Sequence, residues 1–149
     1  MQLIHGDCLD EMDKLIERGV QVDCILTDPP YGTTSCYWDN VIPFDKMWER
    51  LNKLIKPNGA VVLFGSEPFS SYLRMSNIKN YKYDWIWEKS HPTGVALCNK
   101  RPLKYTEFIH IFYKKQPSYY PIKWLGNKCH GDNKYKKGLK YTDSKSQPN

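Results

Sequence analysis

The sequence lacks any long hydrophobic run. No apolar stretch approaches the roughly 18 residues that a transmembrane helix needs. The N-terminal segment also has no basic stretch leading into a long apolar one, as a secretory signal does. Both absences argue against membrane insertion and export. We therefore predict a cytoplasmic protein that does not bind a membrane.

Cysteine pairs are lacking. The five cysteines are widely spaced and contain no C-x-x-C pair, so neither a disulfide framework nor a zinc site is expected. The adjacent Cys129 and His130 do not change this, because two neighbouring ligands without a second pair cannot build a tetrahedral site. We expect small buried or incidental thiols and no bound metal.

Internal repeats are absent, and the charge is unevenly divided. The 149 residues, 40% of them hydrophobic, are enough for one domain with a core. Residues 1–76 hold 7 basic and 11 acidic side chains, net −4, whereas residues 77–149 hold 15 basic and 5 acidic ones, net +10. A basic half rich in Tyr and Trp suits nucleic acid, whose bases can stack on the rings. Solvated lysines beside core aromatics explain the charge pattern equally well.

Hydrophobic periodicity predicts alternating strands and helices. Compact or alternating apolar runs indicate strands, and apolar residues at helical spacing indicate helices. The expected strands are residues 2–5, 22–26, 60–64, 81–87 and 106–113, and the expected helices are residues 9–16, 44–55 and 69–73. This order predicts an α/β fold with a doubly wound, mostly parallel sheet, in which the run 60–64 is buried on both faces.

One short motif carries chemistry. Asp28, Pro29, Pro30 and Tyr31 come where the predicted strand 22–26 ends. In open α/β sheets, ligands bind in the crevice outside the carboxyl ends of the strands. A plain turn is the alternative interpretation.

The motif suits the exocyclic amine of a nucleobase, whose lone pair is delocalised into the ring and is therefore a poor nucleophile. The Asp28 carboxylate and the Pro29 carbonyl can accept the two N–H groups and leave the lone pair free to attack an electrophile. The rigidity of Pro29 and Pro30 fixes that carbonyl. Tyr31 offers a flat face on which an extruded base can stack.

These residues resemble the (D/N/S)-P-P-(Y/F/W) catalytic motif of the DNA amino-methyltransferases. That family transfers a methyl group from S-adenosylmethionine (SAM) to adenine N6 or cytosine N4 and has a Rossmann-like fold. The resemblance implies SAM as cofactor and double-stranded DNA as partner. Asp28 favours adenine, because aspartate at this position is commoner among adenine-N6 enzymes. The resemblance runs from about Leu3 to Pro121 and includes Gly6-Asp7, Trp38-Asp39, Lys56-Pro57-Asn58-Gly59 and Phe64-Gly65-Ser66.

The resemblance also implies further site residues. Asp7 matches the acidic position that contacts the adenine moiety of SAM, with Cys8 beside it and Asp28 at the same cofactor. For Asp7, a role as a helix cap is an equal alternative. Contacts to the base or to DNA are expected from Tyr31, Trp38, Ser66, Lys100 and Arg101.

Two features of the family are absent. The F-x-G-x-G loop that wraps the methionine part of SAM is missing, since the nine glycines form no G-x-G, and so is the H-P-T-Q-K-P-like helix. The chain therefore resembles the catalytic, N-terminal half of such an enzyme, residues 1–121. Residues 122–149 are expected to be a basic polar tail, loose from about Lys128, or the start of a target-recognition region.

This incompleteness sets expectations about partners and activity. We expect a second copy or a missing C-terminal half to complete the enzyme. The 149-residue chain alone should bind SAM weakly or not at all, should not methylate DNA, and should expose an unpaired sheet edge.

The leading interpretation is a SAM-dependent DNA adenine-N6 methyltransferase of a restriction-modification system. One alternative is the same chemistry on another planar amine, namely cytosine N4, an RNA base or a glutamine amide. The other is an inactive nucleic-acid-binding remnant. The basic, aromatic second half favours a nucleic acid as the partner.

Overall fold

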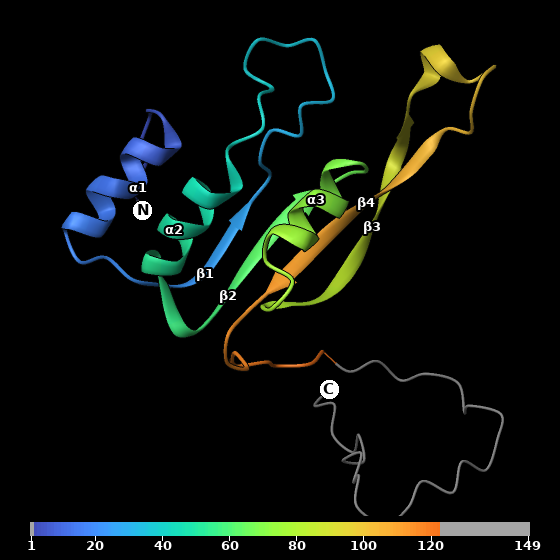
Figure 1. The fold of residues 1–149 in the computed structure, drawn as a ribbon. Helices are drawn as coiled ribbons and strands as arrows, with labels where there is room; N and C mark the ends of the chain where they lie inside the picture. The colour runs from blue at the N-terminus through green and yellow to red at the C-terminus, as the bar shows by residue number, and fades with distance from the viewer. Residues whose placement is uncertain (1, 123–149) are drawn as a thin grey trace, which may run out of the picture. The chain divides into compact units, whose positions relative to one another are not determined.

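The structure is a computed structural model that describes residues 2–122 (Figure 1). The chain divides into two units, Met1–Ser118 and Tyr119–Asn149, and every helix and strand named below lies in the first. The predicted region 122–149, loose from about Lys128, lies outside the described residues except for Ile122. Its boundary therefore stays a prediction.

Helices and strands alternate along the first unit, which confirms the predicted α/β class. Among residues 2–122, no helix is long and apolar enough to span a membrane. The elements are α1 (Cys8–Glu17), β1 (Val22–Thr27), α2 (Phe44–Leu54), β2 (Ile55–Gly65), α3 (Phe69–Ser76), β3 (Tyr81–Thr93), the 3-10 turn η1 (Val95–Leu97) and β4 (Lys104–Phe112).

The predicted strand at residues 2–5 is wrong. The segment has no regular structure, and Leu3 is 87% exposed. Its two apolar residues, Leu3 and Ile4, are adjacent, so in a strand they would point to opposite faces and give neither face a continuous apolar side.

The sheet is mixed in direction. Its strand order is β1-β2-β4-β3, with β1 parallel to β2 and with β4 antiparallel to both of its neighbours. The prediction of a mostly parallel sheet therefore needs correction for residues 2–122, although the Rossmann-like class holds. The physical reason is the short connection between β3 and β4, because a parallel pair needs a crossover of a dozen or more residues.

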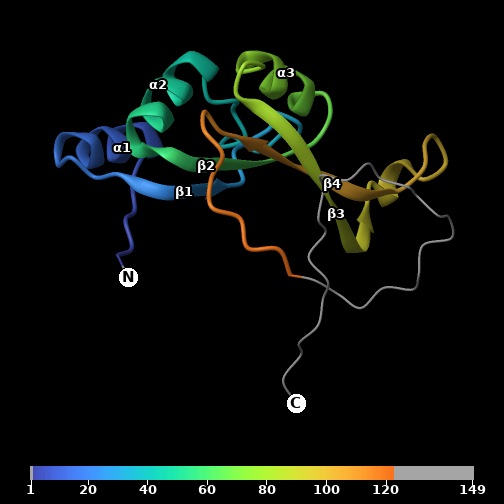
Figure 2. The same cartoon turned by 90° about the horizontal axis from the view of Figure 1, so that it is seen from below.

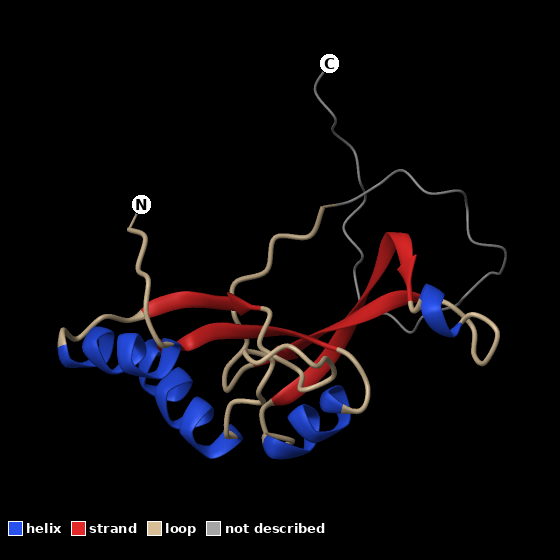
Figure 3. Cartoon of the chain, turned by 90° about the horizontal axis from the view of Figure 1, so that it is seen from above, coloured by secondary structure: helices blue, strands red, loops and turns tan. Residues whose placement is uncertain are grey.

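Helices cover one face of this sheet. Figures 2 and 3 show α1, α2 and α3 on the same side, and the opposite face carries no helix from residues 2–122. Leu26 of β1 is consequently 66% exposed. The doubly wound arrangement, with helices on both faces, is thus not present in the described part of the chain.

The core lies between the sheet and helices α2 and α3. Periodic apolar residues of α2 point to the sheet, as their spacing predicts. Replacing a fully buried leucine such as Leu63 by alanine is expected to cost about 2–5 kcal/mol of stability. The core residues are Met47, Trp48, Leu51, Val61, Leu63, Phe69, Leu73 and Phe112.

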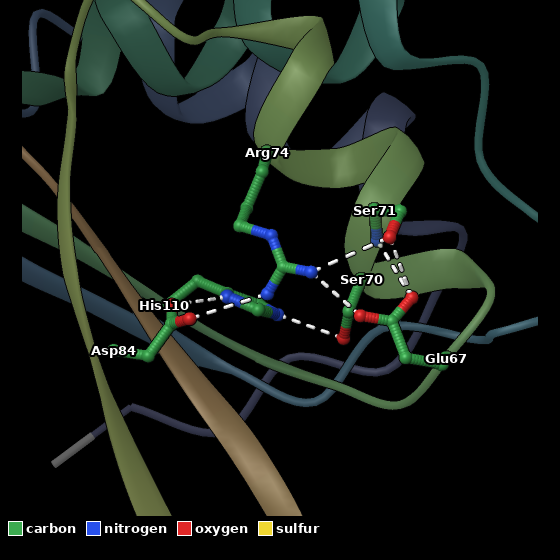
Figure 4. A network of polar contacts seen from close by, with 6 residues as sticks. All are labelled: Glu67, Ser70, Ser71, Arg74, Asp84 and His110. Atoms are coloured by element: carbon green, nitrogen blue, oxygen red, sulfur yellow. Dashed lines mark hydrogen bonds and ion pairs between the residues drawn. The ribbon is translucent and has the colours of Figure 1, made fainter.

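A buried polar network ties α3 to β3 and β4 (Figure 4). His110, which is 0% exposed, lies 2.5 Å from the Asp84 carboxylate through Nδ1 and 2.9 Å from the Ser70 hydroxyl through Nε2. Because a carboxylate only accepts, the neutral ring donates from Nδ1 and accepts the Ser70 proton at Nε2. Arg74 completes the network with ion pairs to Asp84 at 3.2 Å and to Glu67 at 2.6 Å.

This network predicts a pH-dependent stability. Burial lowers the pKa of His110, although the neighbouring Asp84 opposes the shift. The unfolded chain therefore binds a proton more readily, and we expect the free energy of unfolding to fall as pH drops below about 6.5. Urea unfolding between pH 5 and 8 measures this, with H110Q expected to flatten the profile. An NMR titration showing His110 protonated in the folded protein at pH 7 would contradict the prediction.

Candidate active site

The predicted motif lies at the carboxyl end of β1. Thr27 is the last strand residue, and Pro29 is buried while Asp28 is exposed. A cavity of about 330 Å³ opens here, a volume within the usual range for small-molecule sites. Its lining residues are Asp28, Pro29, Pro30, Tyr31, Thr33, Thr34, Trp38 and Asp39. The fold thus brings Trp38 to the four motif residues.

Tyr31 is held by contacts at both ends of its side chain. Its hydroxyl donates a hydrogen bond to the Asp28 carboxylate, and its ring packs on Phe69 with 5.1 Å between ring centroids. Burial first, and then the Asp28 carboxylate, raise the pKa of Tyr31. Tyr31 is therefore a neutral hydrogen-bond donor that orients Asp28, a role that was not predicted from the sequence. Stacking of a base on its ring stays a prediction.

Asp39 organises the loop that follows the motif. Its buried carboxylate accepts hydrogen bonds from the backbone N–H groups of Gly32 (2.9 Å), Thr33 (2.9 Å) and Thr34 (2.7 Å), and from the Thr34 hydroxyl (2.7 Å). These bonds, led by those from Thr34 and Gly32, lower the pKa of Asp39 to about 2. Gly32 has φ +67°, and a Cβ there would lie 2.9 Å from the Val41 side chain.

The amino-acid pattern gave Asp39 no predicted role, although a signal was present. The segment from Gly32 to Thr34 offers consecutive N–H groups and a hydroxyl outside any predicted element. A carboxylate a few residues later is their natural acceptor. The wall of the cavity therefore depends on Asp39, which holds the loop through these hydrogen bonds and has no predicted part in the reaction.

Ser66 lies at the carboxyl end of β2, which neighbours β1. It is buried, and its hydroxyl accepts a hydrogen bond from the Lys104 ammonium at the start of β4. Ser66 does not line the cavity itself. The structure thus places it beside the motif, one strand away.

The remaining predicted residues lie elsewhere. Asp7 caps helix α1 by accepting from Leu9 N at 2.9 Å and Asp10 N at 3.4 Å, as the alternative interpretation expected. Cys8 is exposed as a residue. Partial burial of its thiol and the charge of Asp7 raise the pKa of that thiol. None of the predicted residues Asp7, Cys8, Lys100 and Arg101 lines the cavity, and the last two lie exposed in the β3–β4 connection.

Comparison with known proteins supports the resemblance through structure. No protein-family model and no curated protein matches the chain. The structure of M1.HpyAVI in complex with SAM matches with a TM-score of 0.63 and 26% identity, over 85% of this chain and 63% of that chain. M1.HpyAVI in a second structure matches with the same TM-score and identity, over 85% of this chain and 62% of its own.

A more distant structure shares the fold alone. The cytosine-N4-specific PvuII DNA methyltransferase matches with a TM-score of 0.55 and 17% identity, over 75% of this chain and 49% of its own. The resemblance predicted from the motif is confirmed by these structural neighbours, one of which is a DNA methyltransferase by name. The chain spans less than two thirds of the length of each.

Proposed function

We propose that this chain, whose fold resembles that of DNA methyltransferases, is the catalytic part of a SAM-dependent enzyme that methylates adenine N6 in DNA. The observation that carries the proposal is the cavity at the end of β1, where Asp28 and Pro29 lie together at the wall. Support comes from the 26% identity to M1.HpyAVI, whose structure was solved with SAM.

The chemistry follows from two acceptors at one place. The Asp28 carboxylate accepts one N–H of the amine and the Pro29 carbonyl accepts the other, which localises the lone pair on nitrogen. Tyr31 keeps the carboxylate oriented through its hydroxyl. Bound SAM supplies the methyl group on its positively charged sulfur.

The residues assigned to SAM fit a polar ligand. Asp7 uses only Oδ1 to cap α1, so among the described residues its second oxygen is an available acceptor. Asp7 and Cys8 are both exposed. We propose that these two residues and Asp28 hold SAM, and that a second copy or a further polypeptide segment completes the site.

Nucleoside analysis tests the function. The chain, together with the copy or segment that completes the SAM site, is incubated with unmethylated DNA and radiolabelled SAM, and the DNA is digested to nucleosides; we expect label in N6-methyladenine. Label in N4-methylcytosine would assign the same site to cytosine. Label in RNA or protein would change the substrate class, and DNA binding without label would favour the remnant.

DNA binding is expected to depend on the β3–β4 connection. This segment projects beyond the helix-covered part of the sheet (Figures 1 and 3) and carries Lys100 and Arg101, and Lys104 follows it at the start of β4. Replacing all three by glutamine should reduce the slope of log K against log salt by about 0.9 for each phosphate that is no longer neutralised. Fluorescence anisotropy with a duplex measures the slope, and K46Q, on exposed α2 surface, is the control. An unchanged slope in the triple variant would show that this segment faces away from DNA.

A further inference from the structure

We propose that Lys104 and Ser66 form a phosphate-binding subsite for the nucleotide whose base enters the Asp28 cavity. The inference rests on the proposed function and deepens it, because it assigns a site for the backbone of the substrate beside the site for its base.

Lys104 is a half-buried cation without a carboxylate partner among the described residues. Its ammonium donates to the neutral hydroxyl of Ser66. Two carboxylates lie nearby, but Glu107 is paired with Lys89 and Glu67 with Arg74. The positive charge of Lys104 is therefore left uncompensated.

Burial is the main electrostatic cost at Lys104. It lowers the pKa of Lys104, the charge of Glu107 opposes this shift as the next largest effect, Lys89 and Arg101 add to the lowering, and Glu67 opposes it. A bound phosphate would counter both the burial and the like-charge repulsion. The Ser66 hydroxyl is a second donor for the same oxygen atoms once it rotates.

The subsite lies close to the reacting end of the cavity. Residues Thr27 and Leu63 are register partners, so Asp28 and Ser66 follow the ends of neighbouring strands. Ser66 lies two residues beyond the position opposite Asp28. With about 4.8 Å between strands and about 3.3 Å of rise per residue, the two backbones are roughly 8 Å apart.

Two sources of anion share this chemistry: the phosphate of the nucleotide and the carboxylate of SAM. The full 149-residue chain is titrated by NMR with deoxyadenosine, deoxyadenosine 5′-monophosphate, inorganic phosphate and L-methionine. We expect the nucleotide to bind about tenfold more tightly than the nucleoside, the effect of one charge-assisted hydrogen bond.

Variants then assign the preference. K104Q should abolish the roughly tenfold preference for nucleotide over nucleoside and leave nucleoside binding unchanged. S66A should reduce this preference, and K46Q should retain it. Equal binding of nucleoside and nucleotide to the wild type, or a preference that survives in K104Q, overturns the subsite. If methionine binds through Lys104 and the nucleotide binds no more tightly than the nucleoside, the phosphate subsite is overturned, and Lys104 is assigned to the carboxylate of SAM.

Failure of the base pocket gives a different result. If neither the nucleoside nor the nucleotide binds, the proposed function loses its pocket. The subsite is then decided by inorganic phosphate, which must shift the signals around Lys104 in the wild type and not in K104Q. Absence of that shift overturns the subsite independently.

Discussion

Alanine in place of Asp28 is expected to reduce methyl transfer by about 10²- to 10³-fold. The carboxylate acts on the reacting amine, and loss of one preorganised group of this kind typically costs about 2.7–4 kcal/mol in the transition state. Asp28 is exposed, and its only side-chain partner among the described residues is Tyr31, so the fold should stay intact. Turnover is measured with radiolabelled SAM and DNA on the form of the protein that supports transfer.

Two further variants make the test specific. D28N keeps one acceptor oxygen, and asparagine is an accepted residue at this position of the motif, so D28N should retain part of the transfer that D28A loses. K46Q, on the exposed surface of α2, should transfer at the wild-type rate. Wild-type turnover in D28A, with circular dichroism unchanged, would remove Asp28 from the mechanism.

Replacing Asp39 by alanine is expected to destabilise the loop that forms the cavity wall. The three backbone N–H groups of Gly32, Thr33 and Thr34 would lose their shared acceptor. Their hydrogen exchange should accelerate by about tenfold or more, because exchange follows local opening. Base binding in the cavity should be lost together with this protection, although Asp39 does not touch the motif.

The control for this variant is an acidic residue in a different setting. Asp23 is exposed, and its one ion-pair partner within residues 2–122 is Lys56, so D23A should leave exchange at residues 32–34 unchanged. Unchanged exchange in D39A would mean that the loop is held by something other than this carboxylate.

The loop should also respond to acid. Because the folded pKa of Asp39 is about 2, below its ordinary value of 3.8, the folded state holds the carboxylate more tightly in its charged form. Its stabilising effect is complete above pH ~4 and is lost as pH falls towards 2. Amide chemical shifts of Gly32 and Thr34 between pH 5 and 2 report the transition.

Features that depend on neighbouring residues were predictable from the amino-acid sequence. Helix α2 forms where the apolar period runs from Phe44, and β1 ends where Pro29 and Pro30 forbid further pairing. The motif and its place at a strand end followed from the same local chemistry. The antiparallel β3–β4 pair was not predictable in this way, because the predicted strands 81–87 and 106–113 leave a connection long enough for a crossover, and only the observed length of β3 shortens it.

Features that depend on pairs far apart in the chain were not predictable. Lys104 meets Ser66 across 38 positions and His110 meets Ser70 across 40, and both contacts exist only because β4 lies antiparallel beside β2. Periodicity reports which face of an element is apolar, but it contains no information on strand register. The sequence alone was therefore enough for the α/β class and for the place of the motif at a strand end, while packing and register set the polar contacts around that motif.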